Sequence, residues 1–441
     1  MRYSVGIDLG STTTKAVVLD EQARVLGRGI TNSRSNYKVA CDVALGEALN
    51  RARFGLIDSE LARGGIGPEQ RRAWLADFDR HFRERQYLLQ LDRLGVALDR
   101  HAREERDASV VRPLIAEVVE RMRSEACKLF DAGANRKSDF FRDLAGSRYL
   151  PIAEALSDER GGRFDRIAGL FDKSILEVEN AADDGDLFAT LARAALASST
   201  APAPELRAAV ERAANVSLEQ ASCVGTGYGR ATLPFPKEWI RSEILCHGLG
   251  AHAMFPGTRT VLDIGGQDTK AIQVDAQGIV TSFQMNDRCA AGCGRYLGYI
   301  ADEMNLGLHE LGPLACKSRR QVKINSTCTV FAGAELRERL SLGEKREDIL
   351  AGLHRAIVLR AMSLLARSGG VHSEFTFTGG VARNAAAVAA LEKLILENYG
   401  ELRINISPES IFTGALGAAL FAHREAGKSR ATDGAAAHTR A

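Results

Sequence analysis

The feature that most constrains the fold of this chain is a short Asp-Gly turn that occurs twice. One copy begins at Asp8 and the other at Asp263. In each copy the Asp ends an apolar run, a Gly follows two residues later, Thr-Lys-Ala occupies offsets six to eight, and a second Asp stands at offset twelve. Two apolar runs joined by a Gly-containing turn are typical of a β-hairpin, so each copy predicts one. The repeat therefore predicts an architecture with two matching halves.

Turns of this composition suit a nucleotide. Their backbone N–H groups and hydroxyls can donate to phosphate oxygens, and a carboxylate at the strand end can hold a hydrated cation. An isolated turn of this kind is common, but two copies with matching offsets favour a Mg-nucleotide clamp. Asp8 and Asp263 are expected to hold Mg²⁺ through water, and both, with Gln267, are the candidate catalytic residues. The residues expected to hold phosphates are Gly10, Ser11, Thr12, Thr13, Lys15, Gly265, Gly266 and Gln267.

A third junction supports the clamp. Residues 374–378 read as a strand, Gly379 and Gly380 as a turn, and an Ala-rich helix is expected from Asn384 to about residue 398. Two glycines let the backbone approach a flat ring or a ribose, so Gly379, Gly380 and Asn384 are expected to hold the adenosine. Small residues from Gly414 onward predict a helix that packs closely at a hinge, although a plain core helix fits equally well.

Composition excludes several classes of protein. The 441 residues carry a net charge of +2 with 45% hydrophobic and 26% charged residues, which is globular and too balanced to indicate nucleic-acid binding. There is no uninterrupted run of eighteen apolar residues and no leader pattern at Met1, so we expect no membrane association and a cytoplasmic location. The eight cysteines are then expected to be unpaired.

Four cysteines lie within 40 residues of one another. Cys289 and Cys328 each precede a predicted helix, 294–304 and 331–340, where the positive end of the helix favours a thiolate. Iron–sulfur clusters take four thiolates, so two would be half of a site shared across a two-fold axis. Cys293 is expected one turn inside its helix, where it would be dispensable, as would Cys316. Alternatives are a cluster or zinc held within one chain, or four merely buried thiols.

The middle of the chain differs in composition. Residues 46–217 are Arg-rich with helical periodicity, which predicts an all-helical insertion with solvated charged faces. The expected divisions are a first lobe at 1–45 and 218–255, the insertion at 46–217, a second lobe at 256–407, a closing helix at 408–424 and a disordered tail at 425–441.

The three Gly-containing elements look like the phosphate 1, phosphate 2 and adenosine motifs of the acetate and sugar kinase, heat-shock chaperone and actin superfamily. Met285–Arg295 and Asn325–Ala332 resemble the cluster-binding segments of the ATPase activators of 2-hydroxyacyl-CoA dehydratases and of benzoyl-CoA reductases, the BcrA/BadF-type ATPases. The resemblance covers about 1–40 and 220–425. It implies a two-lobe, actin-like α/β ATPase in which Cys289 and Cys328 hold one 4Fe-4S cluster shared with a partner subunit.

The opening through Tyr37 and the long insertion look most like the larger ATP-binding subunit of benzoyl-CoA reductase. This resemblance implies a heterodimer with a smaller homologous ATPase, bound to catalytic reductase subunits and supplied with electrons by ferredoxin. ATP hydrolysis would move the lobes and the helices beside the cluster and drive a low-potential electron to the partner. Alternatives are a homodimeric activator of a 2-hydroxyacyl-CoA dehydratase, a metal-free small-molecule kinase of the same fold, and a scaffold that binds ATP without turnover.

Overall fold

The computed structural model describes residues 1–33, 36–134, 138–160, 163–181, 187–199, 203–227, 233–287, 289, 292–320, 322–324 and 329–438. The strands are β1 (Arg2–Leu9), β2 (Thr13–Leu19), β3 (Val25–Asn32), β4 (Glu219–Thr226), β5 (Thr260–Ile264), β6 (Thr269–Val274), β7 (Val280–Asn286), β8 (Phe375–Thr378) and β9 (Ile404–Asn405). The helices of the first half are α1 (Tyr37–Arg63), α2 (Pro68–Arg103), α3 (Ala108–Ser124), α4 (Ala126–Phe130), α5 (Phe141–Arg160), α6 (Phe164–Asn180), α7 (Phe188–Ser198) and α8 (Pro204–Ala214). Those of the second half are α9 (Glu243–Met254), α10 (Gly294–Glu303), α11 (Leu308–Ala315), α12 (Thr329–Ser341), α13 (Arg346–Ser368), α14 (Ala385–Tyr399) and α15 (Thr413–His438), with short 3₁₀ turns η2 (Lys237–Trp239), η4 (Gly380–Arg383) and η5 (Pro408–Phe412).

Contacts divide the chain into two units. One consists of Met1 with Gly29–Leu218, and the other of Arg2–Arg28 with Glu219–Ala441. The second unit holds both of the repeated turns, so everything that follows about the site concerns this unit alone.

Both predicted hairpins are present. β1 pairs antiparallel with β2 with Asp8 opposite Lys15, and β5 pairs antiparallel with β6 with Asp263 opposite Lys270. The correspondence continues into the next turn of each half. The carboxylate of Asp20 accepts hydrogen bonds from the N–H groups two and four residues later at 2.9 and 2.8 Å, and that of Asp275 does the same at 2.9 and 2.9 Å. The repeat in the sequence is thus a repeat of three-dimensional structure.

Each hairpin gains a parallel neighbour from a distant part of the chain. β4 pairs with β1, and β8 pairs with β5, which gives sheets of order β3-β2-β1-β4 and β7-β6-β5-β8-β9. Thr226 lies opposite Asp8 in the first sheet, and Thr378 lies opposite Asp263 in the second. The parallel pairing therefore places a hydroxyl beside each strand-end carboxylate.

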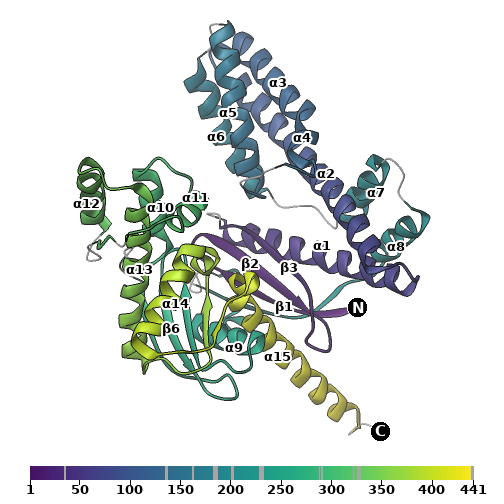
Figure 1. Ribbon diagram of the computed structural model, residues 1–441. Helices are drawn as coiled ribbons and strands as arrows, with labels where there is room; N and C mark the ends of the chain where they lie inside the picture. Colours follow the sequence, from purple (N-terminus) through teal and green to yellow (C-terminus); the bar gives the residue numbers. More distant parts are fainter. Residues whose placement is uncertain are drawn as a thin grey trace. The chain divides into compact units, whose positions relative to one another are not determined.

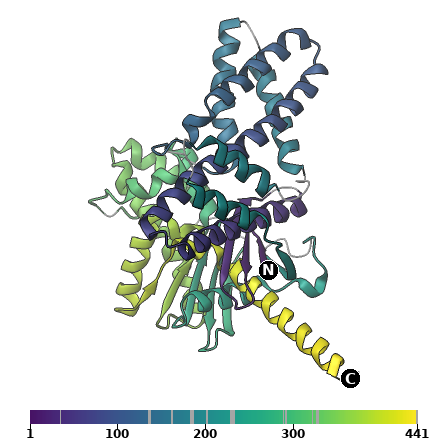
Figure 2. The ribbon, with the colours of Figure 1, turned by 90° about the vertical axis from the view of Figure 1, so that its right-hand side faces the viewer.

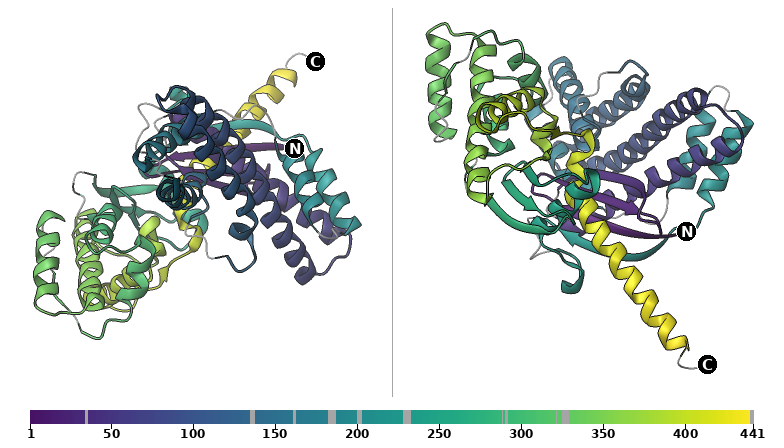
Figure 3. Two further views of the ribbon diagram at one scale, coloured as in Figure 1. Left: turned by 90° about the horizontal axis from the view of Figure 1, so that it is seen from above. Right: turned by 60° about the horizontal axis from the view of Figure 1, so that its bottom comes forward.

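Two helices separate the sheets. α15 packs against β1, β2 and β4, α9 packs against β5, β6 and β7, and the two helices pack against each other (Figure 1; Figure 3, right). Their contact is close because glycines form it: a Cβ at Gly417 would lie 1.8 Å from the carbonyl oxygen of Cys246, and one at Gly250 would lie 2.0 Å from that of Thr413. The predicted small-residue helix is therefore a tight packing element between the two sheets.

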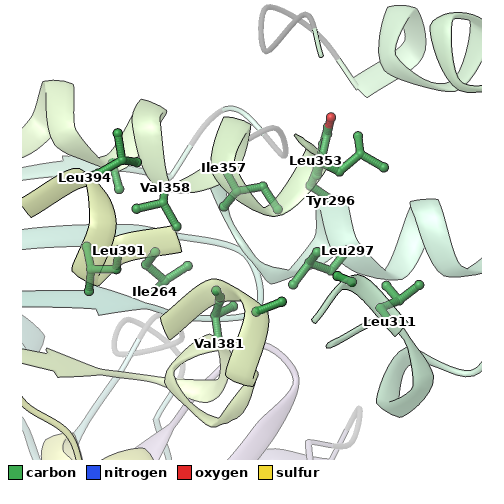
Figure 4. Packing of buried hydrophobic residues seen from close by; sticks show 14 of the residues in the cluster. Ile264, Tyr296, Leu297, Leu311, Leu353, Ile357, Val358, Val381, Leu391 and Leu394 are labelled. Carbon is green, nitrogen blue, oxygen red and sulfur yellow. The ribbon is translucent and has the colours of Figure 1, made fainter. Parts of the chain in front are cut away.

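The larger core of this unit lies on the other side of the second sheet. Figure 4 shows residues from β5, η4, α10, α11, α13 and α14 meeting in one cluster, among them Ile264, Leu297, Ile357 and Val381. α13 is the one helix in the described part of the chain that is long and apolar enough to cross a membrane by composition, but two-thirds of its most apolar window (67%) is buried inside the protein. That burial is what a core helix shows.

The first unit is helical, apart from the end of β3. α2–α6 form a bundle that can be followed in Figure 2, with a core that includes Leu91, Val118 and Tyr149. A second cluster joins α1, α2, α7 and α8 around Phe78 and Phe82. All the described elements within 46–217 are helices, as expected for the insertion, and the α/β fold class with a helical insertion is confirmed.

The C-terminal helix α15 continues to His438, into the segment 425–441 for which a disordered tail is expected, and that expectation stays a prediction. The segment is rich in Ala, which has the highest helix propensity, so it extends a helix that packing against the sheet has already begun.

Candidate nucleotide site

The two repeated Asp residues lie at strand ends in the interior of the second unit. Asp8 is 3% exposed and Asp263 is 2% exposed. One oxygen of Asp8, Oδ1, is buried and has no hydrogen-bond partner among the described residues. Asp263 Oδ2, by contrast, accepts a hydrogen bond from the Thr378 hydroxyl at 2.8 Å. A buried carboxylate oxygen without a partner is costly, so Asp8 is the side chain most in need of a ligand.

A lysine accompanies each Asp, but the two lysines have different surroundings. Lys15 Nζ lies 3.7 Å from Asp8 Oδ2, and a Cβ at Gly10 would lie only 3.0 Å from that ammonium group. Lys270 Nζ is fully buried and contacts three carboxylates, Glu243 at 2.9 Å, Asp268 at 2.9 Å and Asp263 at 3.5 Å. Burial alone would lower the pKa of Lys270, but the three carboxylates outweigh it and raise that pKa above its usual value. Lys15 can therefore face a phosphate, whereas Lys270 holds acids in place.

α9 adds two side chains that the sequence did not single out. His247 Nδ1 lies 3.3 Å from Asp263 Oδ2, and Glu243 reaches the Lys270 ammonium from the first turn of the same helix. Burial would raise the pKa of Asp263, but the charges of His247 and Lys270 hold it well below its usual range. Burial also raises the pKa of the Glu243 carboxyl, against the opposing charge of Lys270. The only signal in the sequence was their spacing of four residues, which places both on one helix face.

The charges around the two Asp residues do not balance. Four carboxylates, two ammonium groups and one imidazole are in contact: Asp8, Glu243, Asp263, Asp268, Lys15, Lys270 and His247. One ligand atom each from Asp8, Glu243 and His247 lie within 4.8 Å of one another. Excess buried carboxylate and an orphaned carboxylate oxygen are what a divalent cation would satisfy, so the residues present fit the expected Mg²⁺.

The two phosphate turns meet each other. A Cβ at Gly266 would lie 2.5 Å from the hydroxyl oxygen of Thr12, so each turn reaches the other across the site. Ser11, Thr12 and Gly266 are exposed, and Gly10, Thr13, Gly265 and Gln267 are half-buried. The structure thus brings the seven turn residues of the predicted set to one place, open to solvent above the buried charges.

The predicted adenosine turn follows β8 and lies next to the end of β5, where the second phosphate turn begins. Gly379 has φ of +88°, and a Cβ there would lie 2.4 Å from the carbonyl oxygen of Ile264, so only glycine fits. Asn384 is the N-cap of α14: its side-chain oxygen accepts from the N–H groups of Ala386 and Ala387, and its amide nitrogen lies 3.0 Å from His354 Nε2. Asn384 thus shapes the turn through its own hydrogen bonds, and a contact with adenosine stays a prediction.

The cysteine positions require a correction. Cys293 is the N-cap residue of α10 and is buried, whereas Cys289, four residues earlier, is itself not part of a helix. The predicted helix start at Gly294 is confirmed, but the prediction that Cys293 lies one turn inside this helix was wrong, because Cys293 immediately precedes it. Cys289 is partly exposed and accepts a hydrogen bond from the Arg360 guanidinium at 3.4 Å, while Cys316 is exposed elsewhere. Cys328 lies outside the described residues.

This geometry can be compared with known proteins. The family described as the BadF/BadG/BcrA/BcrD ATPase family matches residues 5–422, which is nearly the whole chain. The chain belongs to this ATPase family. Its membership agrees with the resemblance found in the sequence and with a site arranged for ATP.

Relatives within the BadF/BadG/BcrA/BcrD family include several activators. The (R)-2-hydroxyglutaryl-CoA dehydratase activating ATPase of Acidaminococcus fermentans is 42% identical over 227 residues, 52% of this chain and 85% of the relative. The 2-hydroxyisocaproyl-CoA dehydratase activator of Clostridioides difficile is 43% identical over 207 residues, 47% of this chain and 75% of the relative. One of the subunits of the benzoyl-CoA reductase of Thauera aromatica is 31% identical over 175 residues, 40% of this chain and 62% of the relative.

Solved structures support the fold. The activator of 2-hydroxyisocaproyl-CoA dehydratase from Clostridium difficile with bound ADPNP superposes with a TM-score of 0.54 at 23% identity, covering 98% of this chain and 97% of the other. Component A of the (R)-2-hydroxyglutaryl-CoA dehydratase of Acidaminococcus fermentans gives a TM-score of 0.51 at 24% identity, covering 97% and 100%. The two-lobe, actin-like fold expected from the sequence is thereby confirmed.

Proposed function

We propose that this chain is an ATP-hydrolysing electron-transfer activator for a partner enzyme that acts on an acyl-CoA, of the 2-hydroxyacyl-CoA dehydratase type. The observation that carries the proposal is the buried charge cluster beneath the two phosphate turns, with Asp8 Oδ1 left without a partner among the described residues. Greater identity to dehydratase activators than to a benzoyl-CoA reductase subunit supports the activator over the reductase component that the insertion first suggested.

The residues of the site have distinct tasks in ATP hydrolysis. Asp8 and Asp263 would hold the waters of a magnesium ion, which neutralises phosphate charge when bound. Lys15 and the exposed N–H groups of the turns would bind phosphate oxygens. We propose Glu243 as the side chain that accepts a proton from the attacking water, since it is a buried carboxylate beside Asp8 and burial raises the pKa of its carboxyl. His247 and Lys270 hold Asp263 and Glu243 in position.

The cysteines would carry the electron. Cys289 is the partly exposed thiol beside α10, and we propose it as a ligand of a 4Fe-4S cluster together with Cys328. A cluster shared with a second subunit has to lie at a surface, which suits the partly exposed Cys289 better than the buried Cys293. A low-potential donor such as ferredoxin would reduce the cluster, and the catalytic component of the partner would receive the electron.

A second candidate is the ATPase component of a benzoyl-CoA reductase. It is favoured by the helical unit of residues 29–218, because the activators align with only about half of this chain. In that case the partner would be a shorter homologous ATPase, and the acceptor an aromatic acyl-CoA.

Anaerobic purification followed by three measurements tests the proposal. We expect Mg²⁺-dependent ATP hydrolysis, an EPR signal from a reduced 4Fe-4S cluster, and ATP-dependent electron transfer to a 2-hydroxyacyl-CoA dehydratase component. Asp8→Asn should remove turnover while leaving the circular dichroism spectrum unchanged, because lost cation positioning costs roughly several kcal/mol of transition-state stabilisation. Hydrolysis without any iron would favour a kinase of the same fold, and unchanged hydrolysis in Asp8→Asn would remove Asp8 from the site.

A further inference from the structure

The segment that carries Cys289 is bonded directly to the second phosphate turn. The N–H groups of Gly294 and Arg295, the first two residues of α10, donate to the carbonyl oxygens of Gly265 and Gly266 at 2.8 and 2.7 Å. The contact is tight, since a Cβ at Gly294 would lie 3.1 Å from the Gly265 oxygen. The helix start therefore rests on the backbone of the turn that is expected to hold phosphate.

Thr269 ties the other parts of the same segment to the turn. It is the first residue of β6, is fully buried, and its hydroxyl donates to the carbonyl oxygen of Gly292. Its partner across the strands is Asn286, the last residue of β7, whose amide nitrogen donates to the carbonyl oxygen of Cys289 at 3.1 Å. Thr269 thus lies between the entry and the exit of the cysteine segment.

These hydrogen bonds restrict the motion of the second phosphate turn relative to the start of α10. Thr269 directly follows Asp268, whose carboxylate is bound to the buried Lys270, so the turn is anchored at one end to the charge cluster. At its other end, Gly266 reaches the first phosphate turn at Thr12. A change in what the turn binds must therefore either break these hydrogen bonds or carry the segment of Cys289 with it.

We propose that the Thr269 hydroxyl is a positioning contact that couples phosphate occupancy of turn 265–268 to the placement of Cys289. The inference rests on the proposed function, because it takes the turn to bind the phosphates of ATP. It adds a route from nucleotide to thiol, since the phosphate turn and the segment of Cys289 share hydrogen bonds.

Hydrogen–deuterium exchange of the full chain tests the coupling, because the bonded amides of Gly294 and Arg295 report on it directly. Exchange in peptides covering residues 286–296 is compared with no nucleotide, Mg-ADP and a non-hydrolysable Mg-ATP analogue. We expect rates that differ at least about fivefold between the two nucleotides, the low end of typical allosteric coupling. Peptides from α3 serve as an internal control and should not respond.

Three variants separate coupling from stability. Thr269→Val keeps the shape of the side chain but removes the hydroxyl, and should weaken the nucleotide response while nucleotide affinity changes less than about threefold, within about 0.7 kcal/mol. Thr269→Ser restores a hydroxyl and should restore the response. Asn286→Ala removes the bond to Cys289 at a half-buried site and should weaken the response near residue 289, which keeps a test available if Thr269→Val does not fold.

The outcomes distinguish this inference from the proposed function. If the wild-type chain binds no ATP, the proposed function fails and the coupling fails with it. If the wild-type chain binds ATP but the exchange rates of residues 286–296 are the same in every nucleotide state, only the coupling is overturned. A full response in folded Thr269→Val, or in Asn286→Ala where Thr269→Val is unfolded, also overturns it.

Discussion

Glu243 is the single side chain whose role depends most on its surroundings. It projects from the first turn of α9 to the Lys270 ammonium, and burial raises the pKa of its carboxyl. We expect Glu243→Gln to lower the rate of ATP hydrolysis by about 100-fold or more, the usual contribution of a general base, with little change in nucleotide affinity. Steady-state hydrolysis and a binding titration measure the two effects separately.

A nearby carboxylate provides the control for this variant. Glu238 lies five residues earlier on η2 with an exposed side chain, so Glu238→Gln changes charge by the same amount without touching the cluster. It should hydrolyse ATP at the normal rate. Equal activity of Glu243→Gln and Glu238→Gln would show that Glu243 takes no part in moving the proton.

The thiols should differ strongly in reactivity. Burial raises the pKa of both Cys223 and Cys246 to about 12, and both are buried, as is Cys41. Because the thiolate is the reactive form, these three should resist iodoacetamide at pH 8, while the exposed Cys127 and Cys316 react.

Peptide mass spectrometry measures the alkylated fraction at each thiol, before and after unfolding in urea. All of the thiols should react once the chain is unfolded. Rapid alkylation of Cys246 in the folded chain would contradict the close packing of α9 against α15.

At the scale of elements, the contact between α9 and α15 depends on glycine. A Cβ at Gly417 would lie 1.8 Å from a backbone oxygen of α9, and backbone cannot move aside as a flexible side chain can. Gly417→Ala should therefore lower the free energy of unfolding by about 2 kcal/mol or more, as overpacking does. Denaturant titration followed by circular dichroism measures the loss.

The same helix offers a matched control. A Cβ at Gly427 would meet no atom within 4 Å, and Ala is the better helix former. Gly427→Ala should therefore leave the protein unchanged or make it more stable by up to about 1 kcal/mol. Similar destabilisation by both substitutions would mean that helix propensity, and not packing, governs this region.

At the scale of the whole molecule, bound iron should determine whether the chain is a monomer or a dimer. If each chain supplies Cys289 and Cys328 to a cluster, two chains are needed for four thiolates. We expect light scattering to give twice the monomer mass after anaerobic reconstitution with iron and sulfide, and the monomer mass again after iron is removed by a chelator. Cys289→Ser should stay monomeric with its nucleotide site intact. A monomer that retains four irons would instead support a cluster held within one chain.

The residues of the site that belong to the repeat could be predicted from the sequence. The spacing of Asp8 and Asp263 predicted both hairpins and both phosphate turns, because a hairpin is formed by residues close together in the chain and carries a local pattern. The same repeat contained Lys270 as the counterpart of Lys15, although its burial among three carboxylates could not be read from the pattern.

The place of Cys293 relative to its helix was less accessible. α10 begins at Gly294, as predicted, and hydrogen bonds to the second phosphate turn hold this start, so Cys293 is the N-cap residue and does not lie one turn inside the helix. Local propensity does not include such long-range partners.

The sequence by itself determined the two matching halves, the strand-end carboxylates and the glycines of the turns, since each depends on neighbours a few residues away. Only the tertiary structure decided that Glu243 and His247 join Asp8 and Asp263, and that Thr269 lies between a phosphate turn and Cys289. The physical reason is that helix packing and strand pairing bring together residues that no local pattern relates. The buried charges then shift one another's pKa only because that packing excludes water.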